Sequence, residues 1–168
     1  EDGTFAIDHS IFKTVDRVRI GGHFYSDKPL LPICWLGGIY AILHHVYSLD
    51  FIQTRALTLR LLTFFGVGSF SILLAYLFCR KLEPLRLSPA WKWAASAGVV
   101  LATWIFSYGT TINNHTPAAC ILFALFCVLD GRAETISKWR AFYAGLLAGA
   151  LFNWDFPTGG IFFAGVAV

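Results

Sequence analysis

The sequence predicts an all-α polytopic membrane protein, in which a transmembrane helix bundle follows an N-terminal extracytoplasmic loop. Of the 168 residues, 57% are hydrophobic and 14% are charged, whereas soluble domains average about 45–50% and 25%. A small soluble domain has too much surface to cover with so few charges, and this apolar content also excludes intrinsic disorder. Two further observations are the long apolar segments and the alternation of basic and non-basic links between them.

Residues 1–49 are expected to form the first extracytoplasmic loop. Within the polar residues 1–28, apolar positions alternate with charged ones before Gly21-Gly22, which is typical of a short hairpin with a Gly-Gly turn. The apolar stretch Leu30–Leu49 contains Pro32, two glycines and several aromatics of the kind found at membrane interfaces. We therefore expect it to lie along the membrane surface as an interfacial helix, with a full span as the alternative.

Residues 50–168 are expected to hold the transmembrane helices. A span needs about 20 apolar residues, and only the first of these segments is comfortably long. The later segments can span if their ends lie among the lipid headgroups, where tryptophan and tyrosine are enriched. The expected helices are 57–79, 93–108, 117–129, 141–154 and 161–168.

The charges in the links predict the topology. The link Arg80–Lys92 has four basic residues against one acidic residue, and Asp130–Arg140 has three against two. Gly109–Thr116 and Asp155–Gly160 contain no lysine or arginine. Basic links favour the cytoplasm, so we expect the non-basic links outside, on the same face as residues 1–28.

Two further expectations follow from composition. The chain has no methionine and ends in the apolar run Ile161–Val168, which leads us to expect an internal piece of a longer membrane protein. The four cysteines lie in apolar surroundings and are expected to be buried hydrophobic residues. No metal site is predicted, because His44-His45 lack cysteine or carboxylate companions.

Several polar residues are candidates for binding an anion on the outer face. Lys28 can provide a point charge for phosphate; in the alternative interpretation, Asp27 and Pro29 simply begin a helix. Asn114 and His115 at a helix N-terminus can also hold an anion. Alternatively, this motif only starts a helix, with Thr116 as the N-cap.

Two more ionisable residues lie at expected membrane boundaries. Asp155 is either an exposed turn residue or part of a site, since ionisable groups in membrane segments are costly and often functional. Arg60 either extends to the headgroups or makes a second phosphate contact. Patterns of nucleotide-driven pumps and of common soluble hydrolases are missing from the sequence.

Four stretches resemble motifs of one enzyme superfamily, the GT-C membrane glycosyltransferases. This superfamily includes the protein O-mannosyltransferase-like and aminoarabinose-transferase-like families. Residues 22–31, GHFYSDKPLL, resemble the family's GHxYSDKPPLL stretch, although Leu30 replaces its second proline. The other stretches are EDGTFAID at 1–8, NNHTPAA at 113–119, and AGLLAGA at 144–150 with the following Asp155-Phe156-Pro157.

The resemblance implies transfer of a sugar from a polyprenyl-phosphate donor to an acceptor on the extracytoplasmic face of a membrane, expected to be the bacterial inner membrane. It implies that Lys28 lies close to the carrier phosphate, and we assign substrate binding to this lysine and to a set of other residues. That set is Tyr25, Asp27, Arg60, Asn114, His115 and Asp155. The catalytic carboxylate is either Asp16 or Asp8, or an acidic residue upstream of Glu1, where the family commonly has it.

The expected partners are the lipid bilayer, the polyprenyl-phosphate sugar and an acceptor. The acceptor can be a glycan, a lipid or a protein, and nucleic acid is not expected. No cofactor is assigned, and dependence on a divalent metal is left open. The alternative functions are a non-catalytic membrane protein of related fold and a transporter, which would place polar groups near the bilayer midplane.

Overall fold

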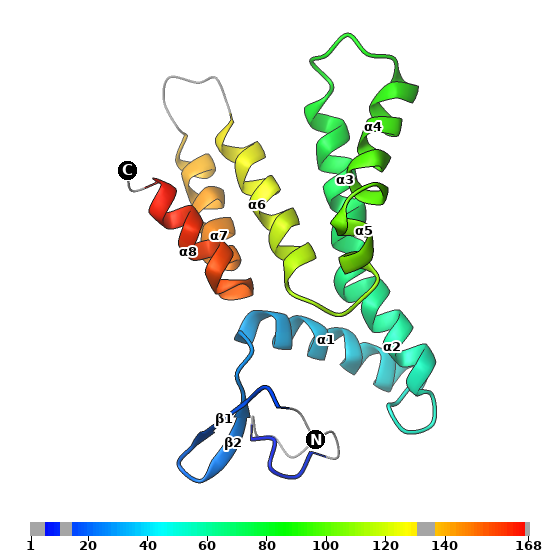
Figure 1. Cartoon of the computed structure of the whole chain (residues 1–168), viewed down its shortest axis with the longest axis vertical. Helices are drawn as coiled ribbons and strands as arrows, with labels where there is room; N and C mark the ends of the chain where they lie inside the picture. Colours follow the sequence, from blue (N-terminus) through cyan, green and yellow to red (C-terminus); the bar gives the residue numbers. More distant parts are fainter. Residues whose placement is uncertain (1–5, 11–14, 131–136, 167–168) are drawn as a thin grey trace.

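The structure is a computed structural model that describes residues 6–10, 15–130 and 137–166. The described residues are mostly helical, with one two-stranded hairpin at one end of a helical bundle (Figure 1). In chain order the elements are β1 (Arg17–Ile20), β2 (His23–Ser26), α1 (Leu30–Tyr47), α2 (Arg55–Thr63), η1 (Phe64–Gly68), α3 (Ser69–Lys81), α4 (Pro89–Leu101), α5 (Trp104–Gly109), α6 (His115–Leu129), α7 (Lys138–Trp154) and α8 (Phe156–Val166).

The predicted hairpin is present and pairs β1 with β2 in antiparallel register. Arg17 lies opposite Ser26, and Ile20 lies opposite His23. The two central turn residues, Gly21 and Gly22, have φ of 59° and 92°. A two-residue hairpin turn with positive φ at both positions favours glycine, because a Cβ is strained there.

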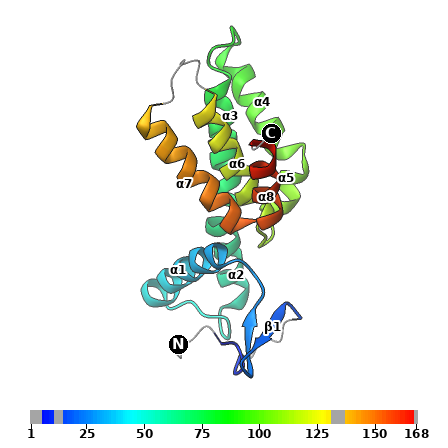
Figure 2. The ribbon, with the colours of Figure 1, turned by 90° about the vertical axis from the view of Figure 1, so that its left-hand side faces the viewer.

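Helix α1 lies across one end of the bundle, roughly perpendicular to α3, α6 and α7 (Figures 1 and 2). Its eighteen residues are apolar enough to cross a membrane by length and composition, and the same holds for the helix Arg55–Lys81. The Trp35 indole of α1 donates a hydrogen bond to the Gly66 carbonyl at 3.1 Å. This contact fixes α1 against the α2–η1–α3 helix.

Helices α2, η1 and α3 form one continuous helix of 27 residues, about 40 Å long at 1.5 Å per residue. This is longer than the bilayer hydrocarbon core of about 30 Å. It includes the predicted helix 57–79 and extends it by two residues at each end. The π-helical turn η1 loosens the regular hydrogen bonding, and Gly66 within it accepts the hydrogen bond from Trp35.

The predicted helix 93–108 is wrong in its bounds. The chain forms α4 from Pro89 and breaks at Ala102-Thr103 before α5 begins. The Thr103 hydroxyl accepts a hydrogen bond from the backbone N–H of Ile105 at 3.3 Å. A threonine that caps a new helix in this way ends the preceding one, which hydropathy alone does not reveal.

Helices α6, α7 and α8 pack around one cluster of buried residues. Ala118 and Ile121 of α6 contact Leu151 and Trp154 of α7, and all four are buried. Helices α6 and α7 begin two and three residues before the predicted 117 and 141. Helix α8 begins at Phe156 rather than at 161, because Pro157 is tolerated in the first helical turn.

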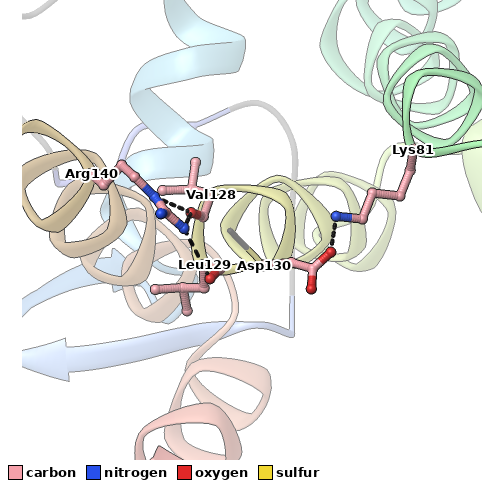
Figure 3. Close-up of polar contacts among 5 residues, drawn as sticks. All are labelled: Lys81, Val128, Leu129, Asp130 and Arg140. Carbon is pink, nitrogen blue, oxygen red and sulfur yellow. Dashed lines mark hydrogen bonds and ion pairs between the residues drawn. The ribbon is translucent and has the colours of Figure 1, made fainter. Parts of the chain in front are cut away.

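The far end of the bundle carries the basic links, and three helices are tied together there (Figure 3). Lys81 of α3 forms an ion pair with Asp130 at the end of α6. The Arg140 guanidinium of α7 donates hydrogen bonds to the carbonyls of Val128, at 2.8 and 3.1 Å, and of Leu129, at 3.1 Å. Arg140 thereby satisfies helix-end carbonyls that lack partners within α6.

Candidate functional site

Asp155 is the centre of a polar junction at the end of the bundle opposite the basic links. It lies between α7 and α8 and is only 5% exposed. The Asn114 amide donates to Asp155 Oδ1 at 2.7 Å, and the Thr158 hydroxyl donates to Asp155 Oδ2. The structure thus brings together Asn114 and Asp155, which lie 41 positions apart in the sequence, and Asp155 is a buried junction residue rather than an exposed turn residue.

His115 is the solvent-exposed member of this junction. Its Nδ1 atom lies 3.7 Å from Asp155 Oδ2, and its side chain is 59% exposed. The edge of its ring also meets the Tyr108 ring, with the centroids 5.6 Å apart. A histidine oriented by a carboxylate and an aromatic ring can contact a ligand or transfer a proton.

The start of α6 differs from the prediction that Thr116 is its N-cap. The helix begins at His115, and the Asn113 side-chain oxygen accepts a hydrogen bond from the Thr116 backbone N–H at 3.0 Å. The Thr116 hydroxyl is buried and has no hydrogen-bond partner among the described residues. Asn113 therefore satisfies this backbone donor, as an asparagine commonly does at a helix start.

Lys28 lies in a second polar group, between the hairpin and α1. Its ammonium is 3.1 Å from an Asp16 carboxylate oxygen and 3.6 Å from an Asp27 oxygen. The hydrogen bond with Asp16 is the main reason that the pKa of Lys28 is raised above its ordinary 10.5. Lys28 therefore stays charged at neutral pH, and Asp27 pairs with it instead of capping α1, since no side-chain hydrogen bond caps that helix.

Asp8 has a different environment from Asp16. One carboxylate oxygen accepts a hydrogen bond from the Phe24 backbone N–H at 2.8 Å, and the other lies 2.7 Å from His23 Nδ1. The Phe24 hydrogen bond is the largest cause of the lowered pKa of Asp8. Both oxygens are engaged in holding residues 6–10 against the hairpin.

The remaining predicted site residues, Tyr25 and Arg60, belong to neither group. Tyr25 pairs with Val18 across the hairpin. Arg60 is exposed on α2 beside a shallow groove of about 330 Å³ that Thr63, Gly68 and Gly109 also line. Arg60 thus lies at the same end of the bundle, next to the link that precedes α6.

The two polar groups are connected through packing rather than through a polar contact. Leu31, three residues after Lys28, packs against the core cluster that includes Trp154, the residue before Asp155. Trp154 in turn meets Trp35 of α1, with ring centroids 6.5 Å apart. The position of α1 therefore sets how far Lys28 lies from Asp155.

Sequence reasoning missed Thr158 and the pairing of Asp16 with Lys28. A signal for Thr158 was available, because a hydroxyl residue three positions after an aspartate at a helix start can bond back to it. The Asp16–Lys28 pair depends on the register of the hairpin, which no local spacing reveals.

Within residues 6–10, 15–130 and 137–166, no group of three or more histidine, cysteine, aspartate or glutamate side chains is arranged to hold a metal ion. No family model, curated protein or solved structure matches the chain.

Proposed function

We propose that the protein is an integral membrane glycosyltransferase, which moves a sugar from a polyprenyl-phosphate donor to an acceptor on the extracytoplasmic face. The observation that carries the proposal is the convergence of three motif stretches at one end of the bundle. Asn114 and Asp155 are hydrogen bonded, and Leu31, which closes the stretch containing Lys28, packs on the core beside Asp155. The ends of α3 and α6 and the starts of α4 and α7, which border the basic links, lie at the other end (Figures 1 and 3).

The links between the helices differ in charge at the two ends of the bundle, and this difference supports an orientation in a membrane. Basic links favour the cytoplasm, so the end with Lys28 and Asp155 faces outside. Helix α1 lies across this end of the bundle (Figure 2), which suits a helix at the membrane surface. A transporter would instead gather polar groups near the middle of the bundle.

Lys28 is suited to hold the phosphate of the donor. Its side chain is 56% exposed, and its charge is balanced by Asp16 and Asp27 until an anion replaces one of them. A lysine–phosphate contact is stronger than a neutral hydrogen bond. It also stabilises negative charge that develops on the leaving phosphate.

Asp16 is the described carboxylate that best suits a general base. It is 51% exposed beside Lys28, whereas both oxygens of Asp8 are engaged. In the proposed step, an acceptor hydroxyl oxygen bonds to the anomeric carbon, and the bond from that carbon to the phosphate oxygen breaks. The phosphate leaves with the bonding electron pair, and Asp16 takes the hydroxyl proton.

The test uses the protein in proteoliposomes with radiolabelled polyprenyl-phosphate sugars and a membrane extract as acceptor. Donor binding and sugar transfer are measured for the wild type, Lys28→Ala and His115→Ala. We expect Lys28→Ala to weaken donor binding by about tenfold or more, as loss of a charge-assisted phosphate contact does. We expect His115→Ala to reduce transfer as well.

Lys138→Ala is the matched control, because it removes an exposed lysine from the opposite end of the bundle. It should leave donor binding unchanged. Equal donor affinity in the Lys28 and Lys138 variants would remove Lys28 from the site. Failure of folded wild-type protein to bind any polyprenyl-phosphate donor would overturn the proposed function.

A further inference from the structure

A groove of about 310 Å³ lies between the end of α3 and the start of α4, at the basic end of the bundle. Its lining includes two cationic side chains, Arg80 and Lys92, and the aromatic side chains of Tyr76 and Trp93. Glu83 completes this set of polar and aromatic residues. The groove is remote from Lys28 and Asp155, and the proposed sugar transfer does not use it.

Glu83 holds both cations at the groove. Its carboxylate lies 3.0 Å from an Arg80 guanidinium nitrogen, and its backbone carbonyl accepts a hydrogen bond from the Lys92 ammonium at 3.2 Å. Arginine has five N–H donors and lysine has three, so both keep donors for an added ligand. One carboxylate against two cations leaves the groove with an excess positive charge.

Two exposed aromatic residues border this positive charge. Trp93 is 55% exposed and Tyr76 is 48% exposed. Such amphipathic rings gather where hydrocarbon meets water. The N-terminal turn of α4 borders the groove through Pro89, and helix N-termini favour negative charge.

We propose that this groove binds the phosphate headgroup of an anionic phospholipid in the cytoplasmic leaflet. Basic pockets between membrane helices on that side favour anionic headgroups, and the acyl chains would extend along the apolar surface of α3 and α4. This inference rests on the orientation given in the proposed function, in which the basic links lie on the cytoplasmic side of the membrane. It does not depend on sugar transfer. The source of the phosphate is the lipid, because the groove opens beside exposed tryptophan and tyrosine.

The test measures equilibrium binding of radiolabelled phosphatidylglycerol and phosphatidylcholine to the protein in mixed micelles. We expect the wild type to bind phosphatidylglycerol about tenfold more tightly than phosphatidylcholine. In the double variant Arg80→Gln/Lys92→Gln this preference should disappear. The charge-preserving variant Arg80→Lys/Lys92→Arg should keep the preference, which would assign it to the positive charge, and the circular dichroism spectrum of the glutamine variant should match that of the wild type.

The matched control is Arg86→Gln/Lys138→Gln, which removes two positive charges from the same end of the bundle but outside the groove. It should keep the preference to within about twofold. An equal loss in both glutamine double variants, or equal binding of the two lipids by the wild type, would overturn the site while leaving the membrane placement intact. Full displacement of the lipid by millimolar inorganic phosphate would also overturn the lipid site. Protein that does not enter a lipid phase at all would overturn the membrane placement.

Discussion

Asp8 and Asp155 are aspartates whose two carboxylate oxygens are both engaged, but they hold different parts of the molecule. Asp8 joins residues 6–10 to the hairpin through Phe24 and His23. Asp155 joins the start of α6 to the turn between α7 and α8 through Asn114 and Thr158. Each aspartate holds its neighbours in place, and the exposed side chains of His23 and His115 lie beside Asp8 and Asp155 respectively.

We predict that the contact of Asp8 with the hairpin is sensitive to acid. The pKa of Asp8 is lowered from its ordinary 3.8, chiefly by the hydrogen bond from the Phe24 N–H. A lowered folded-state pKa means that the stabilisation is present above the unfolded value and is lost as pH falls through the folded value. Protection of the Phe24 amide against hydrogen exchange should therefore fall several-fold between about pH 5 and pH 2.

The variant Asp8→Asn provides the control for this acid transition. The asparagine does not titrate, so protection of the Phe24 amide should be lower than in the wild type at pH 5 and should not show this acid transition. An acid-dependent loss of the same size in both proteins would assign the transition to another group.

At the scale of single residues, the sequence predicted which polar residues are candidates for a site. It did not predict which of them form hydrogen bonds with one another. Asn114 and Asp155 stood out because they are polar at the ends of apolar segments. Their hydrogen bond requires α6 and α7 to pack side by side. Such long-range contacts follow from packing and leave no local pattern in the chain.

At the scale of elements, hydrophobic pattern and turn residues predicted where most helices and the hairpin lie. Gly21-Gly22 predicted the turn, because positive φ favours glycine at both positions. The break between α4 and α5 was missed, because Thr103 ends a helix through its side chain without interrupting the apolar run. The early start of α8 was missed because Pro157 was interpreted as part of a turn.

We predict that Gly159 sets the close approach of α8 to α7. A Cβ at this position would lie 2.5 Å from the Cα atom and 2.9 Å from the backbone nitrogen of Phe152. Backbone atoms cannot rotate away, so Gly159→Ala should force the helices apart. The free energy of unfolding should fall by about 1–3 kcal/mol, the usual cost of overpacking, as measured by reversible unfolding in mixed micelles.

Gly160→Ala is the matched control, since a Cβ there meets nothing within 4 Å. Alanine favours helix over glycine by up to about 1 kcal/mol, so this variant should be as stable as the wild type or slightly more stable. Equal losses in the two variants would show that α7 and α8 do not depend on close packing at Gly159.

At the scale of the whole molecule, the bundle has two chemically different ends. One has the hairpin, α1 and the Asp155 junction, and the other has the two basic links (Figure 1). Alternation of link charge predicted this separation, because each helix reverses the direction of the chain. The orientation of α1 across the bundle depends on its contacts with η1 and α7, which the sequence suggested only through its interfacial aromatics.

We predict that the two ends lie on opposite sides of a membrane. In protein without native cysteines, single cysteines replacing His23 and Thr111 should react with a membrane-impermeant maleimide from the same side. A cysteine replacing Arg86 should react only after the membrane is permeabilised. Labelling of positions 86 and 23 from the same side would contradict this arrangement.

The π-helical turn at Phe64–Gly68 has a consequence for how this protein tolerates changes in length. A π turn holds one residue more than the α-helical turn that it replaces. Removing one residue here converts η1 to regular α-helix and leaves the faces of α2 and α3 in place. Removing one residue elsewhere in Arg55–Lys81 rotates everything beyond it by about 100°, which turns buried positions such as Leu74 away from the bundle. Deletion of one residue should therefore be tolerated at this turn, whereas deletion of one residue elsewhere in residues 55–74 should lower the free energy of unfolding.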